Sequence, residues 1–497
     1  MSINEKWKRQ KTFGKQIMNA SHKASYYKYP ELGSVRLLFE LMHDSTQYNH
    51  HMESSVARVT SRLAWASSAP AQELKQRARE LLIGVSPTGA LGNKLPFIMS
   101  LPERFVAAKA WEARRSRTER KLFETLQQEV ADALSSSHKV EPNRSWTRLF
   151  LEKRASFGFA SDVEGAFAVG MHGIAGALTI AAPMQSFCLA LCHYPQYQHM
   201  LHEEVDRILG DARMPTLQDI PDMPVLHAFI RETLRWRPPV PTSIPHELTQ
   251  DDVYDGYHIP KGSVVHALEW SISRDPQVFP EPDAWNPTRW LNPEFPTYLE
   301  PLCQFSTITD YSQFGYGDRK CQGMGVTEAS LFVGLGSIAW LFSINASTTA
   351  IEDRGVQAKP TAPVLGDSPE HTDLHTAIPL TADEALVTDD LLDSKNGENV
   401  KLIAERAGTM PTTCTSAPVQ SPDGTYDADP TMSFSTLLIA KPLPIKFDMS
   451  VRSQKRAEVV LKRWIDLELQ GEFERDKVYW KDGNASDTQY GWGRVFS

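Results

Sequence analysis

The sequence of 497 residues is 41% hydrophobic and carries a formal net charge of −9. This composition excludes a chain that is disordered throughout, and the acidic balance excludes a general nucleic-acid binder, which would carry a basic excess. Five cysteines without a Cys-x-x-Cys pair exclude a disulfide framework and a zinc ribbon, and they indicate a reducing compartment. The first residues lack the apolar run of a signal peptide or membrane anchor.

Residues 1–160 predict helices, because apolar residues are spaced along stretches rich in Lys, Arg and Glu. Residues 165–192 then contain no formally charged side chain, and a stretch of this length could cross a bilayer. Pro183, His172 and Gln185 within it favour a long helix buried in a protein core. A membrane span and a core helix are therefore both open interpretations of this segment.

Residues 238–300 are rich in Pro, Gly and β-formers, and their alternation around two Gly turns predicts short strands and hairpins. The fold class is therefore mainly α with a small β region. Residues 353–430 are rich in Thr, Asp and Pro, which predicts a low-complexity, disordered insertion; an intron translated in error is the alternative. Residues 434–447 predict a strand hairpin, and residues 452–469 predict a basic amphipathic helix.

A glycine-rich loop with a cysteine precedes an apolar, helix-like run, and it reads Phe314-Gly-Tyr-Gly-Asp-Arg-Lys-Cys-Gln-Gly323. Gly315 and Gly317 let the backbone turn tightly and approach a flat ligand. Cys321 is expected at a helix N-terminus beside Arg319 and Lys320, where the helix dipole and the cations favour the thiolate. Such a thiolate suits axial ligation of haem iron, whereas the alternative is an inert buried cysteine.

These offsets, Phe314-x-x-Gly317-x-Arg319-x-Cys321-x-Gly323, resemble the haem loop of the cytochrome P450 family. The resemblance implies a P450-like fold that binds haem b, with the Cys321 thiolate on the iron and Arg319 on a haem propionate. It also implies a catalytic domain over residues 1–352 that opens at the family's third major helix, without the family's membrane anchor and first helices. After the insertion at 353–430, residues 431–497 would supply a C-terminal hairpin, a basic helix and a tail.

Two further motifs stand in the order that the family uses. Glu232 and Arg235 match its Glu-x-x-Arg motif, and two such side chains share one face of a helix. Arg289, in the segment Asn-Pro-Thr-Arg-Trp, resembles the arginine that completes a buried charge cluster in the family. The resemblance implies that this cluster supports the loop around the cysteine. The alternative for Glu232 and Arg235 is an ordinary surface pair.

Three residues fall where the family places contacts to the haem propionates. Trp7 and Lys11 occupy the positions of a Trp-x-x-x-Arg pair, and lysine supplies the charge without the two-pronged geometry of arginine. His246 occupies the position of another arginine, and a histidine can also donate to a carboxylate. The alternatives are a frayed basic terminus for Trp7 and Lys11 and a surface histidine in a strand for His246.

Residues 175–180 align with the pattern of the family's distal helix over the haem. Ala175, Gly176 and Thr179 are predicted catalytic positions, because the glycine allows close approach and the threonine keeps a hydroxyl. Leu178 replaces the family's acid, and leucine cannot relay a proton. The predicted substrate pocket draws on this helix and on the segment after the Glu-x-x-Arg motif, and it comprises His172, Ala175, Leu178, Val240, Thr242 and Ile244. A satisfied core histidine is the alternative for His172.

The resemblance implies a haem-thiolate monooxygenase that oxidises a hydrophobic small molecule with dioxygen. Its electrons would come from NADPH through NADPH-cytochrome P450 reductase. Lys8, Arg9, Lys11 and Lys320 are predicted to face an acidic reductase, with simple solvation as the alternative. The style of the motifs resembles fungal members of the family, many of which serve secondary metabolism.

Other functions stay open at this point. The leucine at position 178 is compatible with a haem-thiolate isomerase, a dehydratase or a peroxide-using enzyme. The missing first helices are compatible with a non-catalytic relic of the family. Residues 165–192 suit an integral membrane protein. The resemblance implies the endoplasmic reticulum membrane, whereas the sequence as written, without an N-terminal anchor, predicts a cytoplasmic or peripheral protein.

Overall fold

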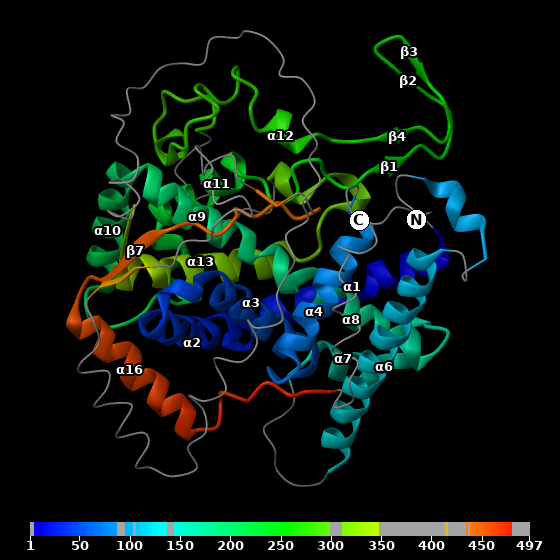
Figure 1. Ribbon diagram of the computed structural model, residues 1–497, viewed down its shortest axis with the longest axis horizontal. Coiled ribbons are helices and arrows are strands. Elements are labelled where there is room, and N and C mark those ends of the chain that lie inside the picture. Colours follow the sequence, from blue (N-terminus) through cyan, green and yellow to red (C-terminus); the bar gives the residue numbers. More distant parts are fainter. Residues whose placement is uncertain are drawn as a thin grey trace.

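The computed structural model describes residues 4–86, 95–102, 106–136, 144–298, 311–346, 413–415, 434–435 and 438–479. Helices dominate this part of the chain (Figure 1). They are α1 (Glu5–Lys23), α2 (Tyr29–His43), α3 (Tyr48–Trp65), α4 (Ala71–Val85), α6 (Ala107–Ser135), α7 (Trp146–Phe157), α8 (Asp162–Thr179), α9 (Ala181–His193), α10 (Pro195–Leu209), α11 (Pro224–Trp236), α12 (Glu269–Ile272), α13 (Met324–Leu341) and α16 (Gln454–Leu469).

The hairpins predicted between residues 238 and 300 are confirmed. β1 (His246–Glu247) pairs with β4 (Val264–Val265), and β2 (Asp252–Tyr254) pairs with β3 (Tyr257–Ile259), both antiparallel. Both pairs project from the helical body, with β2 and β3 at the tip (Figure 1). Asp255 and Gly256, which have positive φ angles of 52° and 80°, form the turn between β2 and β3.

A second sheet joins segments that are far apart in the sequence. β7 (Phe447–Val451) lies between β5 (Phe342–Ala346) and β6 (Thr413–Thr415) and is antiparallel to both. Phe342 lies opposite Val451, and Ala346 lies opposite Phe447. Of the predicted insertion at 353–430, only residues 413–415 are among the described residues, and the rest of that prediction lies outside them.

The centre of the molecule is α3, whose residues are nearly all buried and which packs against α2, α4 and α8. Its buried charges are paired, because an unpaired charge in a protein core is costly. Arg58 donates to both oxygens of Glu40 at 2.8 and 3.0 Å. Arg79 donates to Glu53 at 2.6 Å. The core can therefore contain a polar helix at its centre.

The uncharged segment at 165–192 lies within two core helices. α8 ends at Thr179 and α9 begins at Ala181, and both pack into the main hydrophobic core. The stretch Asp162–His193 and the helix Met324–Leu341 are long and apolar enough to cross a membrane, but 83% and 78% of their most apolar windows are buried inside the fold. This burial is the property expected of the core-helix interpretation.

Side chains cap the N-termini of several helices that carry the site. The Asn4 side chain accepts the Trp7 N–H and caps α1, and the Ser161 side chain accepts the Glu164 N–H and caps α8. At the start of α11, Glu204 accepts the N–H groups of Val225 and Leu226 at 2.8 and 2.9 Å. These bonds satisfy donors that a helix start leaves without an intrahelical partner.

The predicted basic helix at 452–469 is confirmed as α16. Arg452 and Arg456 hold its beginning on the rest of the fold, because each donates at 2.7 Å to Asp206 of α10. Arg456 also donates to the Trp340 carbonyl at the end of α13 at 2.7 Å. Within the described part of the predicted hairpin at 434–447, Phe434 forms an antiparallel bridge with Pro442, and β7 begins at Phe447.

Candidate functional site

The cysteine loop is built from two short 3₁₀ turns, at Ser312–Phe314 and Gly317–Arg319, followed by α13. Gly315 and Gly317 have φ angles of 80° and 56°, a region that favours glycine. The Cys321 N–H donates to the Phe314 carbonyl at 2.8 Å, which closes the loop. Cys321 therefore stands at the junction of the loop and α13, as the sequence predicts.

Cys321 is exposed, unlike two cysteines of the helical core. Cys188 is fully buried and Cys192 half-buried, both in α9. Burial raises the pKa of Cys192 to about 12, and burial also raises the pKa of Cys188 well above its ordinary value. At Cys321 the surrounding protein also raises the thiol pKa, which the Gly323 N–H lowers in part. Desolvation by the surrounding protein therefore acts against the thiolate that the sequence predicts at Cys321.

The predicted charge cluster forms at the end of α11, and its three side chains have no exposed area. Arg235 donates to the two oxygens of Glu232 at 2.9 and 2.8 Å, and Arg289 donates to one of them at 3.0 Å. The Trp290 indole and the Asn286 N–H also donate to Glu232, at 3.0 and 2.8 Å. The surface-pair alternative is therefore wrong.

The two arginines of the cluster also organise the chain between residues 273 and 284. Arg235 donates to the carbonyls of Ser273, Pro282 and Ala284 at 3.0, 2.7 and 2.8 Å. Arg289 donates to the Pro280 carbonyl at 3.0 Å. A segment with little regular structure is thus fixed by buried side chains.

Trp7, Lys11 and Arg319 meet beside the cysteine loop. The Arg319 guanidinium lies 4.3 Å from the centre of the Trp7 ring, and the Lys11 ammonium lies 4.8 Å from it. Lys11 also pairs with Asp318 at 2.6 Å. Trp7 and Lys11 therefore belong to α1 and not to a frayed terminus, and the structure brings two predicted propionate-binding cations together.

One face of α8 is open near this loop. Ala175 is exposed, and His172, Gly176 and Thr179 are partly exposed at helical spacing. His172 Nε2 lies 3.3 Å from the Gln322 side chain, next to Cys321 in sequence. Thr179 Oγ1 donates to the Ala175 carbonyl at 2.8 Å.

The prediction that Leu178 lines this face is wrong. Its side chain is 8% exposed and packs in the main core, because it points away from the open face of α8. The open face of α8 therefore presents the predicted catalytic positions 175, 176 and 179 but not position 178.

The segment after α11 carries the remaining predicted pocket residues. Val240 is partly buried, whereas Thr242, Ile244 and His246 are exposed. His246 lies in β1, as the strand alternative expects. The roles of Val240, Thr242 and Ile244 around a substrate, and of His246 towards a haem propionate, stay predictions.

Sequence reasoning missed two polar residues beside the loop. Glu269, at the start of α12, accepts hydrogen bonds from Ser312 and Gln313 at 2.6 Å each. Gln322 bridges α1 and α8, because it donates to the Lys11 carbonyl at 2.9 Å and contacts His172. A lone carboxylate in the apolar stretch 264–272 is the signal that could have marked Glu269.

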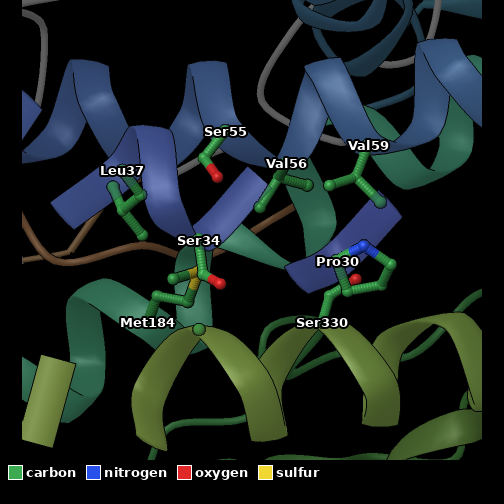
Figure 2. Close-up of a pocket in the computed structure, with 9 residues that line it drawn as sticks. Pro30, Ser34, Leu37, Ser55, Val56, Val59, Met184 and Ser330 are labelled. Carbon is green, nitrogen blue, oxygen red and sulfur yellow. The ribbon is translucent and has the colours of Figure 1, made fainter. Parts of the chain in front are cut away.

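A small hollow elsewhere does not belong to this site. It lies between α2, α3, α9 and α13 and is lined by residues such as Ser34, Val56, Met184 and Ser330 (Figure 2). It has space for little more than one water molecule. We interpret it as a gap in helix packing.

Comparison with known proteins identifies the class. The family model of cytochrome P450 matches residues 94–359, which is more than half of the chain. The chain therefore belongs to the cytochrome P450 family.

Its relatives include fungal monooxygenases. Cytochrome P450 monooxygenase fogE of Aspergillus ruber is 27% identical over 360 residues, which cover 71% of this chain and 65% of that protein. Cytochrome P450 monooxygenase virE of Hypocrea virens is 29% identical over 355 residues, covering 69% and 63%. Cytochrome P450 monooxygenase psoD of Aspergillus fumigatus is 39% identical over 160 residues, covering 32% and 31%. The chain thus spans just under two thirds of the length of the first two proteins.

Solved structures show the same fold. A zebra fish cytochrome P450 with progesterone matches with a TM-score of 0.56 and 22% identity, covering 70% of this chain and 77% of that one. Another, with abiraterone, has a TM-score of 0.53 and 22% identity, covering 70% and 76%. At this identity the likeness concerns the fold alone.

The residues around Cys321 fit a haem group. Cys321 is exposed as a residue, and side-chain atoms added at Gly315 and Gly317 would meet nothing within 4 Å, so a flat group can approach the loop. Lys11 and Arg319 stand together over the Trp7 ring, and cations of this kind can pair with propionates. The neighbouring face of α8 offers the small, exposed Ala175. The chain thus has a thiol, cations and an open helix face in one place.

Proposed function

We propose that this protein is a haem-thiolate monooxygenase that oxidises a hydrophobic small molecule with dioxygen. One observation carries the proposal: Cys321 is exposed on a glycine-turned loop beside the open face of α8. When bound, haem b supplies dioxygen activation, and a cysteine ligand favours cleavage of the O–O bond. The fungal monooxygenase relatives support the same activity.

The chain's own residues have separate roles in this proposal. Cys321 would bind the haem iron and Arg319 and Lys11 would hold the propionates, while Trp7 contacts both of these cations. The loop of Phe314, Gly315, Gly317 and Gly323 shapes the surface beneath the haem. Iron binding favours deprotonation of the Cys321 thiol, because a coordinating thiol is deprotonated.

The α8 face would receive dioxygen and substrate. Ala175 is small and exposed, whereas Gly176 packs closely against Thr60 of α3. The Thr179 hydroxyl can hold or pass a proton after it releases the Ala175 carbonyl. Val240, Thr242 and Ile244 would complete an apolar substrate pocket with His172. The fungal relatives favour a substrate from secondary metabolism.

Electrons would come from NADPH-cytochrome P450 reductase, an acidic partner that docks near Lys8, Arg9, Lys11 and Lys320. In the structure, Lys8 pairs with Glu5 at 2.8 Å and Arg9 with Glu164 at 3.4 Å. Since these cations already have carboxylate partners, their attraction for an acidic surface is weaker than the sequence suggests. By family association we place the protein at the endoplasmic reticulum membrane.

The test is the absorption spectrum of the haem-loaded, reduced chain under carbon monoxide. The wild type and Cys192→Ser should show the strongly red-shifted band of thiolate ligation. Cys321→Ser should lose it. Retention of that band in Cys321→Ser, or its absence in the wild type, would refute the proposal.

A second function is favoured by one observation, the lack of a carboxylate on the open face formed by residues 172, 175, 176 and 179. A haem-thiolate isomerase, dehydratase or peroxide-using enzyme needs no proton delivery of the monooxygenase kind. Product formation without reductase and NADPH would establish this second function in place of the first.

A further inference from the structure

Glu269 is a buried carboxylate directed at the cysteine loop. Its side chain lies at the start of α12, and the residue is 3% exposed. Three side chains of the loop surround it: Ser312 Oγ and Gln313 Nε2 at 2.6 Å, and Tyr316 Oη at 3.4 Å. Burying a carboxylate is costly unless donors satisfy it, and here all three donors come from one short segment.

That segment is connected to Cys321 by the backbone. The Gly315 N–H donates to the Ser312 carbonyl at 2.8 Å, and the Cys321 N–H donates to the Phe314 carbonyl at 2.8 Å. Residues 312–316 therefore form the part of the loop against which Cys321 is placed. Whatever fixes this part also fixes the direction of the thiol.

The other end of α12 is attached to the charge cluster. The Ser273 carbonyl, directly after the helix, accepts a hydrogen bond from Arg235 at 3.0 Å. The Trp270 N–H donates to the Pro241 carbonyl at 2.9 Å, which ties α12 to the segment after α11. Glu269 thus joins a rigid, fully buried cluster to a loop that turns on two glycines.

We propose that Glu269 is a positioning residue, whose carboxylate holds residues 312–316 and thereby orients Cys321. The proposal rests on the proposed function for its catalytic meaning, since Cys321 is placed there as the haem ligand. Glu269 acts through Ser312, Gln313 and Tyr316 and not by direct contact with a substrate. Burial raises the pKa of Glu269, and the hydrogen bonds from Ser312, Tyr316 and Gln313 offset part of that rise.

The first experiment measures backbone hydrogen exchange in the full haem-free chain. Glu269→Gln keeps the size of the side chain but removes its charge. One of the two acceptor oxygens becomes an NH2 group, which cannot accept the hydrogen bonds from the loop. Exchange at Gly315 and Cys321 should become at least about tenfold faster, since hydrogen bonds to a charged group are lost. Glu269→Ala should give the same pattern without a new donor.

The matched control is Glu204→Gln. Glu204 is also a buried carboxylate, 4% exposed, but it accepts the N–H groups of Val225 and Leu226 and not the loop. Its substitution should speed exchange at Val225 and Leu226 and leave residues 312–321 unchanged. Unchanged exchange in both Glu269 variants, or an equal increase in Glu204→Gln, would overturn the proposal.

The second readout is the thiolate fraction of the reduced, carbon monoxide-bound form. Glu269→Gln should lose the red-shifted band several-fold faster than the wild type and Glu204→Gln on warming. Equal rates in the three proteins would also overturn the proposal. A wild type without the band refutes the proposed function instead, and hydrogen exchange then decides on Glu269 by itself.

Discussion

Glu232 and Cys321 lie in neighbouring regions that are held in opposite ways. Glu232 has no exposed area, and side chains and backbone donate to both of its oxygens. Cys321 is exposed, and its loop turns on Gly315 and Gly317. A buried charge needs complete hydrogen bonding, whereas a loop that presents a ligand must leave one side chain free. The loop therefore takes its rigidity from neighbours such as the cluster.

The largest expected effect comes from breaking the buried cluster. Glu232→Ala leaves Arg235 and Arg289 buried without their carboxylate, which should lower the free energy of unfolding by about 3–5 kcal/mol. Chemical denaturation followed by tryptophan fluorescence measures this loss. Glu124→Ala, in an exposed pair with Arg120, is the control and should cost about 0.5 kcal/mol. Similar losses in both variants would contradict the role of the cluster.

A second test uses acid, because buried histidines resist protonation. Burial, with help from Arg231, lowers the pKa of His227 to about 4 from 6.5. The unfolded chain therefore binds a proton first, so this contribution to stability is present above pH 6.5 and is lost as the pH falls towards 4. The contribution is about 3 kcal/mol at most.

The measurement is the unfolding free energy at several pH values for the wild type and His227→Leu. The variant should lose less stability between pH 6.5 and 4. The exposed His199, changed to Gln, is the control and should follow the wild type. Parallel curves for the wild type and His227→Leu would show that His227 titrates normally.

A smaller effect sharpens the comparison at the loop. Gly317→Ala forces alanine to a φ of 56°, and it should cost roughly 1 kcal/mol, without a clash. Gly256→Ala, in the turn of the β2–β3 hairpin at a φ of 80°, should cost a similar amount. Only Gly317→Ala should also weaken haem retention, measured as the rate of haem transfer to apomyoglobin. Equal haem retention in both variants would show that Gly317 does not contribute to the surface that binds haem.

The smallest effect concerns the surface near Lys11. Asp318→Asn removes the carboxylate that pairs with Lys11 and should leave the melting temperature unchanged. It should raise the rate of reduction by an acidic reductase at low ionic strength, and the gain should vanish in high salt. Stopped-flow reduction under carbon monoxide measures it. A gain that persists in high salt would point to a cause other than charge.

The sequence allowed prediction of the cluster and of the loop, because fixed spacing in short motifs carries both. Glu232 and Arg235 are one helical turn apart, and Gly315 and Gly317 adopt the positive φ angles that their type permits. The orientation of Leu178 could not be predicted, since it depends on which face of α8 the surrounding helices cover.

Other parts of the site depend on long-range packing. Glu269 is separated from Ser312 by 43 residues, and no local pattern connects them. The pKa of Cys321 also escaped prediction, because desolvation depends on all the protein around the thiol and not on its flanking residues.

The pairing of β5 with β7 has a consequence for the length of the chain between them. Ala346 and Phe447 lie opposite each other, so the polypeptide that leaves one strand returns to the same place. For a flexible connection, each doubling of length costs only about 0.6 kcal/mol of closure entropy. A shift of pairing by one residue would instead turn Phe342 and Ile344 out of the core. The strand register at the two ends is therefore the part of this connection that cannot shift without exposing core side chains.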